Sequence, residues 1–271
     1  MAQIRQPAVA GQFYPSSPKA IRQQIESFCE KGTEQKEAIA CMLPHAGYMY
    51  SGAVACSVVA RIKIRDNLII LGPNHTGLGK PFSILAEGSW LTPLGNASIN
   101  TALANALLKR CSSLAIDTKA HQFEHSIEVE LPILQYYKKD FSFVPIVVAA
   151  QDLESYQRVG EEIASAIKDS KLDKETLIIA SSDMTHYEDA ITAKEKDSQA
   201  IKAILELDEK NLWSVINKLD ITMCGYGPAI IMISAAKGLG AKNAELVRYQ
   251  TSGDVTGDNS SVVGYAGIII T

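Results

Sequence analysis

The sequence predicts an α/β fold: a single domain, residues 1–271, with a mostly parallel or mixed central sheet flanked by helices. Apolar runs rich in β-branched residues alternate with segments of helical periodicity, which is the pattern of βαβ units. Hydrophobic residues make up 46% and charged residues 21% of the chain, as in ordinary globular proteins. No repeat, low-complexity segment or Pro/Ser-rich linker divides the sequence, so one domain is the simpler interpretation.

The first half of the chain should begin with a helix. Ser17 is a good N-cap residue and Pro18 suits the first helical position, while Ile21 and Ile25 form an apolar stripe. Gly32 stands where a C-terminal cap is expected. Strands are then predicted at residues 38–43, 67–71, 82–86 and 97–99, and helices at residues 52–62 and 101–110.

The second half continues the alternation. A helix is predicted at residues 126–137, and Pro132 should strain or kink it because proline has no N–H to donate. Strands at residues 143–148 and 177–181 enclose an amphipathic helix at residues 153–168. Further helices are predicted at residues 193–205, 211–219 and after Gly227–Pro228. The last strands are predicted at residues 245–250 and 262–270.

Charge and composition argue against several classes of partner. A net charge of −4 gives no electrostatic reason to expect nucleic acid or an anionic membrane. No apolar run approaches the ~18 residues of a membrane span, and the first residues lack a signal-peptide pattern. The five cysteines are odd in number and contain no C-x-x-C pair, so free thiols in a reducing compartment are expected. We therefore expect a cytoplasmic protein.

Three of the five histidines follow predicted strands. His45 comes after the run at residues 39–43, His75 after the run at 68–71, and His186 after the run at 177–180. Ligands of α/β sheets bind outside the carboxyl ends of the strands, and imidazole is both a common metal ligand and a proton carrier near neutrality. A site built from these loops is predicted, although a single loop histidine is more often structural. The wide spacing matches no zinc-finger pattern.

The other two histidines, His121 and His125, are four residues apart. They resemble one helical face, but the segment lacks the H-E-x-x-H order of a zinc protease. Two interpretations of the segment remain open. Either Ser126 with Glu128 or Glu130 marks the start of a helix, or His125 and Glu128 support a site.

Cys224 and Asp183 are candidates for other reasons. Cys224 immediately precedes an apolar helix, whose N-terminus stabilises a thiolate that can bind a metal or act as a nucleophile. An ordinary buried thiol fits the sequence nearly as well. Asp183 lies three residues before His186, where it can orient an imidazole, reach the outer shell of a metal, or cap a turn.

Taken together, the motifs resemble the Memo family, named for a mediator of cell motility, and in bacteria and archaea the B protein of the AmmeMemoRadiSam system. The resemblance runs from about Pro7 to the C-terminus. It is carried by AVAGQFYP (8–15), PHAGY (44–48), GPNH (72–75), EHSIE (124–128), SSD (181–183) with His186, and MCG (223–225).

The resemblance implies a fold similar to class III extradiol dioxygenases, which hold non-haem iron with two histidines and a glutamate. Memo proteins resemble them with cysteine in place of the carboxylate, so His45, His75 and Cys224 become the implied metal ligands. His186 falls where the dioxygenases keep a catalytic acid/base histidine, and Asp183 lies beside it. The other implied pocket residues are Phe13, where some members carry tryptophan, and Tyr48, His125 and Glu128.

Three functions follow as hypotheses. The first is a metal-dependent oxidoreductase of unknown substrate, in which Fe(II) or copper is favoured and zinc is also suited to the ligands. The second is a metal-free enzyme with Cys224 as nucleophile, His186 as base and Asp183 as orienting group. The third is a non-catalytic module that binds a small molecule or peptide. Other AmmeMemoRadiSam system proteins are further candidate partners.

Overall fold

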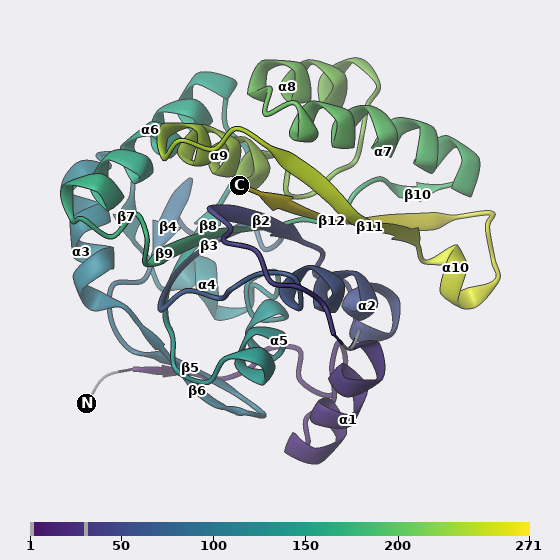
Figure 1. The fold of residues 1–271 in the computed structure, drawn as a ribbon, viewed down its shortest axis with the longest axis horizontal. Helices are drawn as coiled ribbons and strands as arrows, with labels where there is room; N and C mark the ends of the chain where they lie inside the picture. The colour runs from purple at the N-terminus through teal and green to yellow at the C-terminus, as the bar shows by residue number, and fades with distance from the viewer. Residues whose placement is uncertain (1–2, 30–31) are drawn as a thin grey trace.

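A mixed sheet runs through the molecule, and its central strands are parallel (Figure 1). The computed structural model describes residues 3–29 and 32–271. The parallel strands lie side by side in the order β6 (Gly95–Ile99), β8 (Ser142–Val148), β3 (Asn67–Pro73), β9 (Thr176–Ser181) and β2 (Ala40–Leu43). Parallel neighbours have their carboxyl ends at one edge of the sheet, which is where the loops predicted to carry the site begin.

Antiparallel strands extend the sheet at both ends. Beyond β2, β12 (Val262–Ile270) pairs with β2, β11 (Ala244–Thr251) and β10 (His186–Glu188). At the other end, β5 (Ser89–Thr92) pairs with β6 and with β1 (Ile4–Arg5). The strand β4 (Phe82–Ile84) pairs with β8 and with β7 (Ala115–Ile116). The predicted mixed sheet is therefore confirmed.

Helices cover both faces of the sheet. One face packs against α3 (Thr101–Arg110), α6 (Leu153–Asp169), α7 (Ala190–Leu205), α8 (Glu209–Lys218) and α9 (Tyr226–Gly238). The other packs against α1 (Pro18–Phe28), α2 (Tyr48–Val59) and α5 (Glu130–Tyr137). Along β3, Ile69 and Leu71 join the first core whereas Leu68 and Ile70 join the second. Burial on both faces explains why these strands read as continuous apolar runs.

Several boundaries differ from the predicted ones. The helix α1 begins as expected, since the Ser17 hydroxyl accepts the Ala20 N–H at 3.1 Å. It ends at Phe28 with Cys29 as its cap, so the prediction that Gly32 caps it is wrong. The helix α2 begins at Tyr48 rather than at residue 52, which places its first turn directly after the predicted histidine loop.

The helix α5 is shorter than predicted, and this changes the role of Pro132. It begins at Glu130 rather than at residue 126, so Pro132 lies in its first turn. The N–H groups of a first turn have no partner within the helix, and proline is tolerated there. The expected kink is therefore unnecessary. Residues 126–129 form turns instead, and this segment belongs to the site described below.

The later helices differ less. The helices α7 and α8 begin at Ala190 and Glu209, a few residues before the predicted starts at 193 and 211. Two short helices, α4 (Lys119–Gln122) and α10 (Gly253–Thr256), have no predicted counterpart. Within residues 3–29 and 32–271, no helix has both the length and the apolar character needed to cross a bilayer.

The contact between α6 and α9 generates a stability prediction. A Cβ added at Gly160 on α6 would lie only 2.6 Å from the Ile231 carbonyl oxygen of α9, a backbone atom that cannot rotate away. Alanine normally favours a helix over glycine by about 1 kcal/mol, but overpacking costs ~1–3 kcal/mol. We expect Gly160→Ala to lower the free energy of unfolding, measured by urea denaturation.

Glu161→Ala, at the exposed neighbouring position on α6, is the control and should change this free energy by less than about 0.5 kcal/mol. A Gly160→Ala protein as stable as the wild type would show that the two helices are not in close contact at this point.

Candidate functional site

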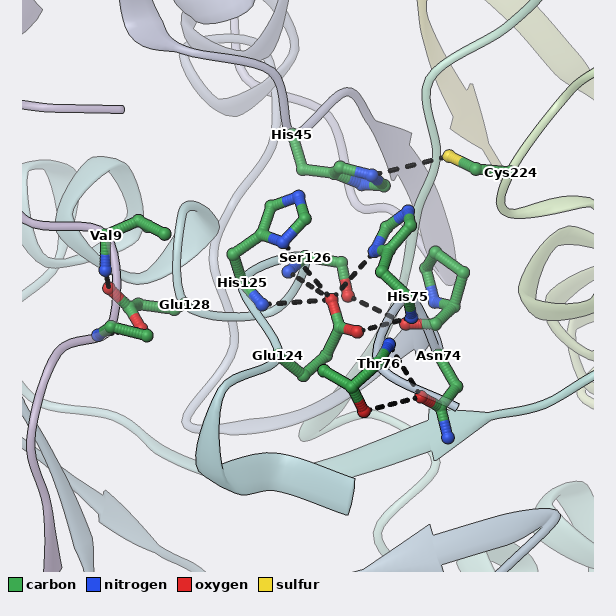
Figure 2. A network of polar contacts seen from close by, with 12 residues as sticks. Val9, His45, Asn74, His75, Thr76, Glu124, His125, Ser126, Glu128 and Cys224 are labelled. Carbon is green, nitrogen blue, oxygen red and sulfur yellow. Dashed lines mark hydrogen bonds and ion pairs between the residues drawn. The ribbon is translucent and has the colours of Figure 1, made fainter. Parts of the chain in front are cut away.

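Neighbouring strand ends bring two histidines and an aspartate together. His45 follows β2, Asp183 follows β9 and His75 follows β3, and β9 lies between β2 and β3 with parallel pairing on both sides. The loop between α4 and α5 reaches the same edge and adds His125. The predicted convergence of strand-end loops is therefore seen for His45 and His75, and His125 joins them (Figure 2).

The three imidazoles form a compact group. One ring nitrogen from each of His45, His75 and His125 lies within 4.8 Å of the others. His75 and His125 are stacked, with ring centroids 4.6 Å apart and an angle of 22° between the planes. The His45 ring stands nearly perpendicular to both, at 73° to His75 and 81° to His125. Such a group could hold a metal ion.

Cys224 completes this cluster on the side of His45. Its Sγ lies 3.4 Å from His45 Nε2 and accepts the Asp183 N–H at 3.3 Å (Figure 2). The next residue must be glycine, because a Cβ at Gly225 would collide with the Ser181 carbonyl oxygen and with the Ser182 side chain. Gly225 also donates its N–H to Ser182 Oγ at 3.0 Å. The glycine thus allows the loop before α9 to lie against the end of β9.

A buried carboxylate orients His75. Glu124 accepts the backbone N–H of His75 at 2.6 Å and lies 2.9 Å from His75 Nδ1. A carboxylate only accepts, so Nδ1 carries a proton, and in the neutral ring Nε2 keeps its lone pair for a ligand. Burial raises the pKa of Glu124, but its hydrogen bonds and the His75 charge outweigh this and hold it at about 2. Burial lowers the pKa of His75, but the hydrogen bond and charge of Glu124 raise it by more, so the pKa of His75 lies above its ordinary value.

A hydroxyl orients His45 in the same way. Ser181 Oγ lies 2.8 Å from His45 Nδ1 and donates to the Ser126 carbonyl oxygen at 2.8 Å. Since the hydroxyl proton is used in that bond, His45 Nδ1–H donates to Ser181 and Nε2 is left bare towards Cys224. Burial, followed by the charges of nearby histidines, lowers the pKa of His45 well below its ordinary value. His45 is therefore a neutral imidazole.

Behind Ser181 lies a second buried acid. Glu130 Oε1 is 3.0 Å from Ser181 Oγ, and the residue has no solvent exposure. Burial raises the pKa of Glu130 well above its ordinary value. Ser181 Oγ is the donor to Glu130 Oε1 as well as to the Ser126 carbonyl oxygen, so its single proton is shared between these two acceptors and not with His45. The chain from Glu130 through Ser181 thus holds His45 in one tautomer.

The two predicted catalytic residues differ in their surroundings. Asp183 Oδ1 accepts the backbone N–H of His45 at 2.8 Å, and burial raises the pKa of Asp183 to about 6. His186 opens β10, where its backbone N–H donates to Thr222 Oγ1 and its Nδ1 lies 3.0 Å from the Thr222 carbonyl oxygen. A carbonyl only accepts, so His186 Nε2 is the ring nitrogen that is free to accept a proton.

The remaining predicted pocket residues lie at different depths. Phe13 places its ring edge against His125, with centroids 4.9 Å apart. Tyr48 is buried in the core, where its hydroxyl donates to the Val129 carbonyl oxygen at 2.8 Å. Glu128 faces the N-terminal segment, and its carboxylate accepts hydrogen bonds from Ala8 and Val9 among others (Figure 2). Of these three, Phe13 is the one in ring contact with an imidazole of the cluster.

His121 points elsewhere. Its Nε2 lies 3.1 Å from the Ser83 carbonyl oxygen, and its ring packs against Trp90 with centroids 5.9 Å apart. The four-residue spacing from His125 does not place the two rings on one helical face, because α4 ends at Gln122.

Sequence reasoning did not assign a role in the site to Glu124, Ser181 or Glu130. The first two lie inside the motifs that carried the family resemblance, Glu124 directly before His125 and Ser181 two residues before Asp183. That position is the signal that could have identified them.

Comparisons with known proteins cover almost the whole chain. A family model described as Memo-like protein matches residues 5–269. Curated MEMO1 family proteins from Methanopyrus kandleri (44% identical, 98% of each chain), Methanosarcina mazei (45%, 99% of each) and Methanocaldococcus jannaschii (43%, all of each) are similar to it.

A solved structure, an uncharacterized protein from Escherichia coli K12, has a TM-score of 0.59 at 14% identity, covering 85% of this chain and 98% of that one. At this identity the likeness shows the fold alone. The family model and the curated relatives, in contrast, match over nearly the full length of the chain. The chain belongs to the Memo family.

Proposed function

We propose that the protein binds one transition-metal ion through His45, His75 and Cys224 and uses it in a redox reaction on a small-molecule substrate. The observation that carries the proposal is the pair formed by Cys224 Sγ and the bare Nε2 of His45, 3.4 Å apart. The second bare nitrogen, His75 Nε2, is oriented by Glu124. Burial and oriented lone pairs are what a metal site requires of its ligands.

The distance between sulfur and nitrogen fits a shared metal. Typical metal–nitrogen bonds of ~2.0–2.1 Å and metal–sulfur bonds of ~2.3 Å, at a tetrahedral angle, separate the two ligand atoms by about 3.5 Å. Cys224 Sγ and His45 Nε2 are 3.4 Å apart, so they can bind one ion with almost no movement. Ring nitrogens of His45 and His75 lie within 4.8 Å of each other, so a small closure would bring His75 to the same ion.

His125 is less suited than Cys224 to be the third ligand. A metal lies in the plane of an imidazole, along the lone pair of the binding nitrogen. The rings of His75 and His125 are stacked 4.6 Å apart at only 22°, so their lone pairs run alongside each other instead of meeting at one point. We assign His125 to the substrate side of the metal, where Phe13 covers its ring edge.

Two imidazoles and a thiolate suit Fe(II), copper or zinc, with Fe(II) or copper required for electron transfer. When bound, the metal would supply Lewis acidity and electron exchange. The chain itself supplies proton carriers: His186 has a free Nε2, and Asp183 has a pKa raised by burial to about 6. We also propose a reducing, cytoplasmic location, which the five free thiols support.

The metal-free alternative is less well supported. A nucleophilic Cys224 would need to be a thiolate, but burial and the Asp183 charge raise the pKa of its thiol. Its imidazole contact is His45 rather than His186, and burial lowers the pKa of His45. Proton transfer from the thiol to this imidazole is therefore disfavoured. A binding module that uses the same pocket remains the second candidate, because the fold alone does not establish catalysis.

The ligand assignment makes a direct prediction. In protein loaded with Co(II), His45→Ala, His75→Ala and Cys224→Ala should each weaken binding by more than ~100-fold, because each removes a bond to the metal. His125→Ala should retain the ion. Isothermal titration measures the affinity, and a thiolate-to-cobalt absorption band in the near ultraviolet reports Cys224.

His186→Ala is the matched histidine control and should also retain the ion. If His125→Ala lost the metal while Cys224→Ala kept it, the site would be three imidazoles and the cysteine assignment would be wrong. Negligible binding by the wild type would remove the metal proposal altogether.

The orientation of His45 by Ser181 makes a second prediction. Ser181→Ala leaves His45 Nδ1 without its acceptor, so the ring can turn or change tautomer, and metal affinity should fall about 10–100-fold. Ser57→Ala is the control, since that buried hydroxyl bonds only the Val54 carbonyl oxygen of its own helix. Equal affinities in the two variants would mean that packing alone fixes the His45 ring.

Redox function is tested with the metal-loaded wild type. Oxygen uptake is followed with catechols and with small thiols as trial substrates. His186→Ala should retain the metal but lose turnover, because the free ring nitrogen that carries the proton is gone. Saturable binding of these molecules without any oxygen uptake would favour the binding-module alternative.

A further inference from the structure

A second concave site lies away from the histidine cluster. A cavity of about 680 Å³ opens beside the edge strand β1 and is bordered by β5, by α3 and by the segment from Ile116 to Phe123. This volume lies within the ~300–1,000 Å³ range of small-molecule pockets. Neither His45, His75 nor Cys224 lines the cavity. A ligand in it would therefore not occupy the proposed metal position.

Large apolar side chains gather at this cavity. Ile4 is 48% exposed, Ile116 63% and Phe123 60%, and all three line it. Single exposed apolar residues are common on protein surfaces, but several around one hollow indicate a binding site. The buried ring of Trp90 forms another part of the wall.

Two side-chain nitrogens of residues that line the cavity make no hydrogen bond within the described part of the chain. Trp90 Nε1 and His121 Nδ1 are buried atoms with no hydrogen-bond partner among the described residues. His121 Nε2 faces the Ser83 carbonyl oxygen and carries the proton, so Nδ1 is an acceptor, whereas Trp90 Nε1–H is a donor. An unpaired buried polar group costs ~1–3 kcal/mol. A ligand that offers both an acceptor and a donor would remove this cost.

The charges in the wall favour an uncharged ligand. Arg5 lies over the Trp90 ring at 4.0 Å, but its guanidinium is already paired with Glu128 at 2.7 Å and donates to the His121 and Glu124 carbonyl oxygens. No cation is left for an anion. The lining also holds the Glu87 carboxylate, which further disfavours an anion. The other polar groups are carboxamides and hydroxyls, from Gln3, Gln6, Asn105, Gln122, Ser89, Thr101 and Thr118.

We propose that this cavity binds a small uncharged aromatic molecule of one or two fused rings that carries an amide-like donor and acceptor. The rings would lie against Trp90, Ile116 and Phe123, and the amide-like group would face the polar wall. The proposal does not depend on the metal, and neither the site nor its ligand class follows from the function proposed above.

The two tryptophans of the chain, Trp90 and Trp213, provide the test. Trp213 lies on α8 against Tyr156 and Tyr226 and does not line the cavity. The protein labelled with nitrogen-15 is titrated with 2-naphthamide while the two indole N–H signals are followed by NMR. We expect the Trp90 signal to shift saturably and the Trp213 signal to stay in place. The anion 2-naphthoate should bind about tenfold more weakly.

Variants separate this cavity from the histidine cluster. Phe123→Ala should weaken 2-naphthamide binding about tenfold, which corresponds to roughly 1.4 kcal/mol of lost apolar contact. Ile191→Ala, at another exposed apolar position outside the cavity, should leave binding unchanged, as should His75→Ala. No saturable Trp90 shift up to the solubility limit, equal shifts of both tryptophans, or binding lost in His75→Ala would each overturn the proposal.

Discussion

The buried carboxylate of Glu124 is the constraint on which the geometry of the site depends. A charge without solvent contact is tolerated only when it is paired and hydrogen-bonded. Glu124 meets this condition by accepting the backbone and ring N–H groups of His75 and the backbone N–H groups of His125 and Ser126. These donors come from the end of β3 and from the loop before α5. The requirement to satisfy one charge therefore joins two segments that are about 50 residues apart.

The loop before α5 holds a second buried carboxylate, which faces the N-terminal segment. Glu128 accepts hydrogen bonds from the Arg5 side chain, from backbone N–H groups of the N-terminal segment and from the Tyr14 hydroxyl at 2.6 Å. Arg5 also donates to the Glu124 carbonyl oxygen at 2.6 Å, so it contacts the loop at both acidic residues. Breaking a buried pair of this kind typically costs ~3–5 kcal/mol. The N-terminal segment is thus part of the support for His125.

Local sequence signals predicted most helices and the longer strands, but not the short strands β1, β5, β7 and β10. They placed His45 and His75 at one sheet edge because both follow strands that read as apolar runs. They did not identify Ser181 or Glu130 as the groups behind His45. Ser181 is 136 residues from His45 along the chain, and no local pattern records which strand will lie beside which. The predicted start of α5 was wrong because residues 126–129 have helical composition, but their polar groups bond to the site instead.

The buried carboxyl groups near Cys224 also set the charge of the metal site proposed above. A divalent ion bound to one thiolate has a net charge of +1, which is costly to bury. Glu124 stays ionised at the site because its hydrogen bonds hold its pKa at about 2, and its −1 charge offsets this +1. Asp183, whose pKa burial raises to about 6, adds a further negative charge above that pH. Glu130, in contrast, has a pKa raised by burial and adds no charge.

Without the ion, burial and Asp183 raise the pKa of the Cys224 thiol, and the site is closer to neutral as S–H. A bound metal ion displaces that proton, since a coordinated thiol is deprotonated. Exchange of one proton for one divalent ion makes the net charge of the site more positive by one unit. The ionised carboxylates of Glu124 and, above about pH 6, of Asp183 are the groups that would offset this added charge.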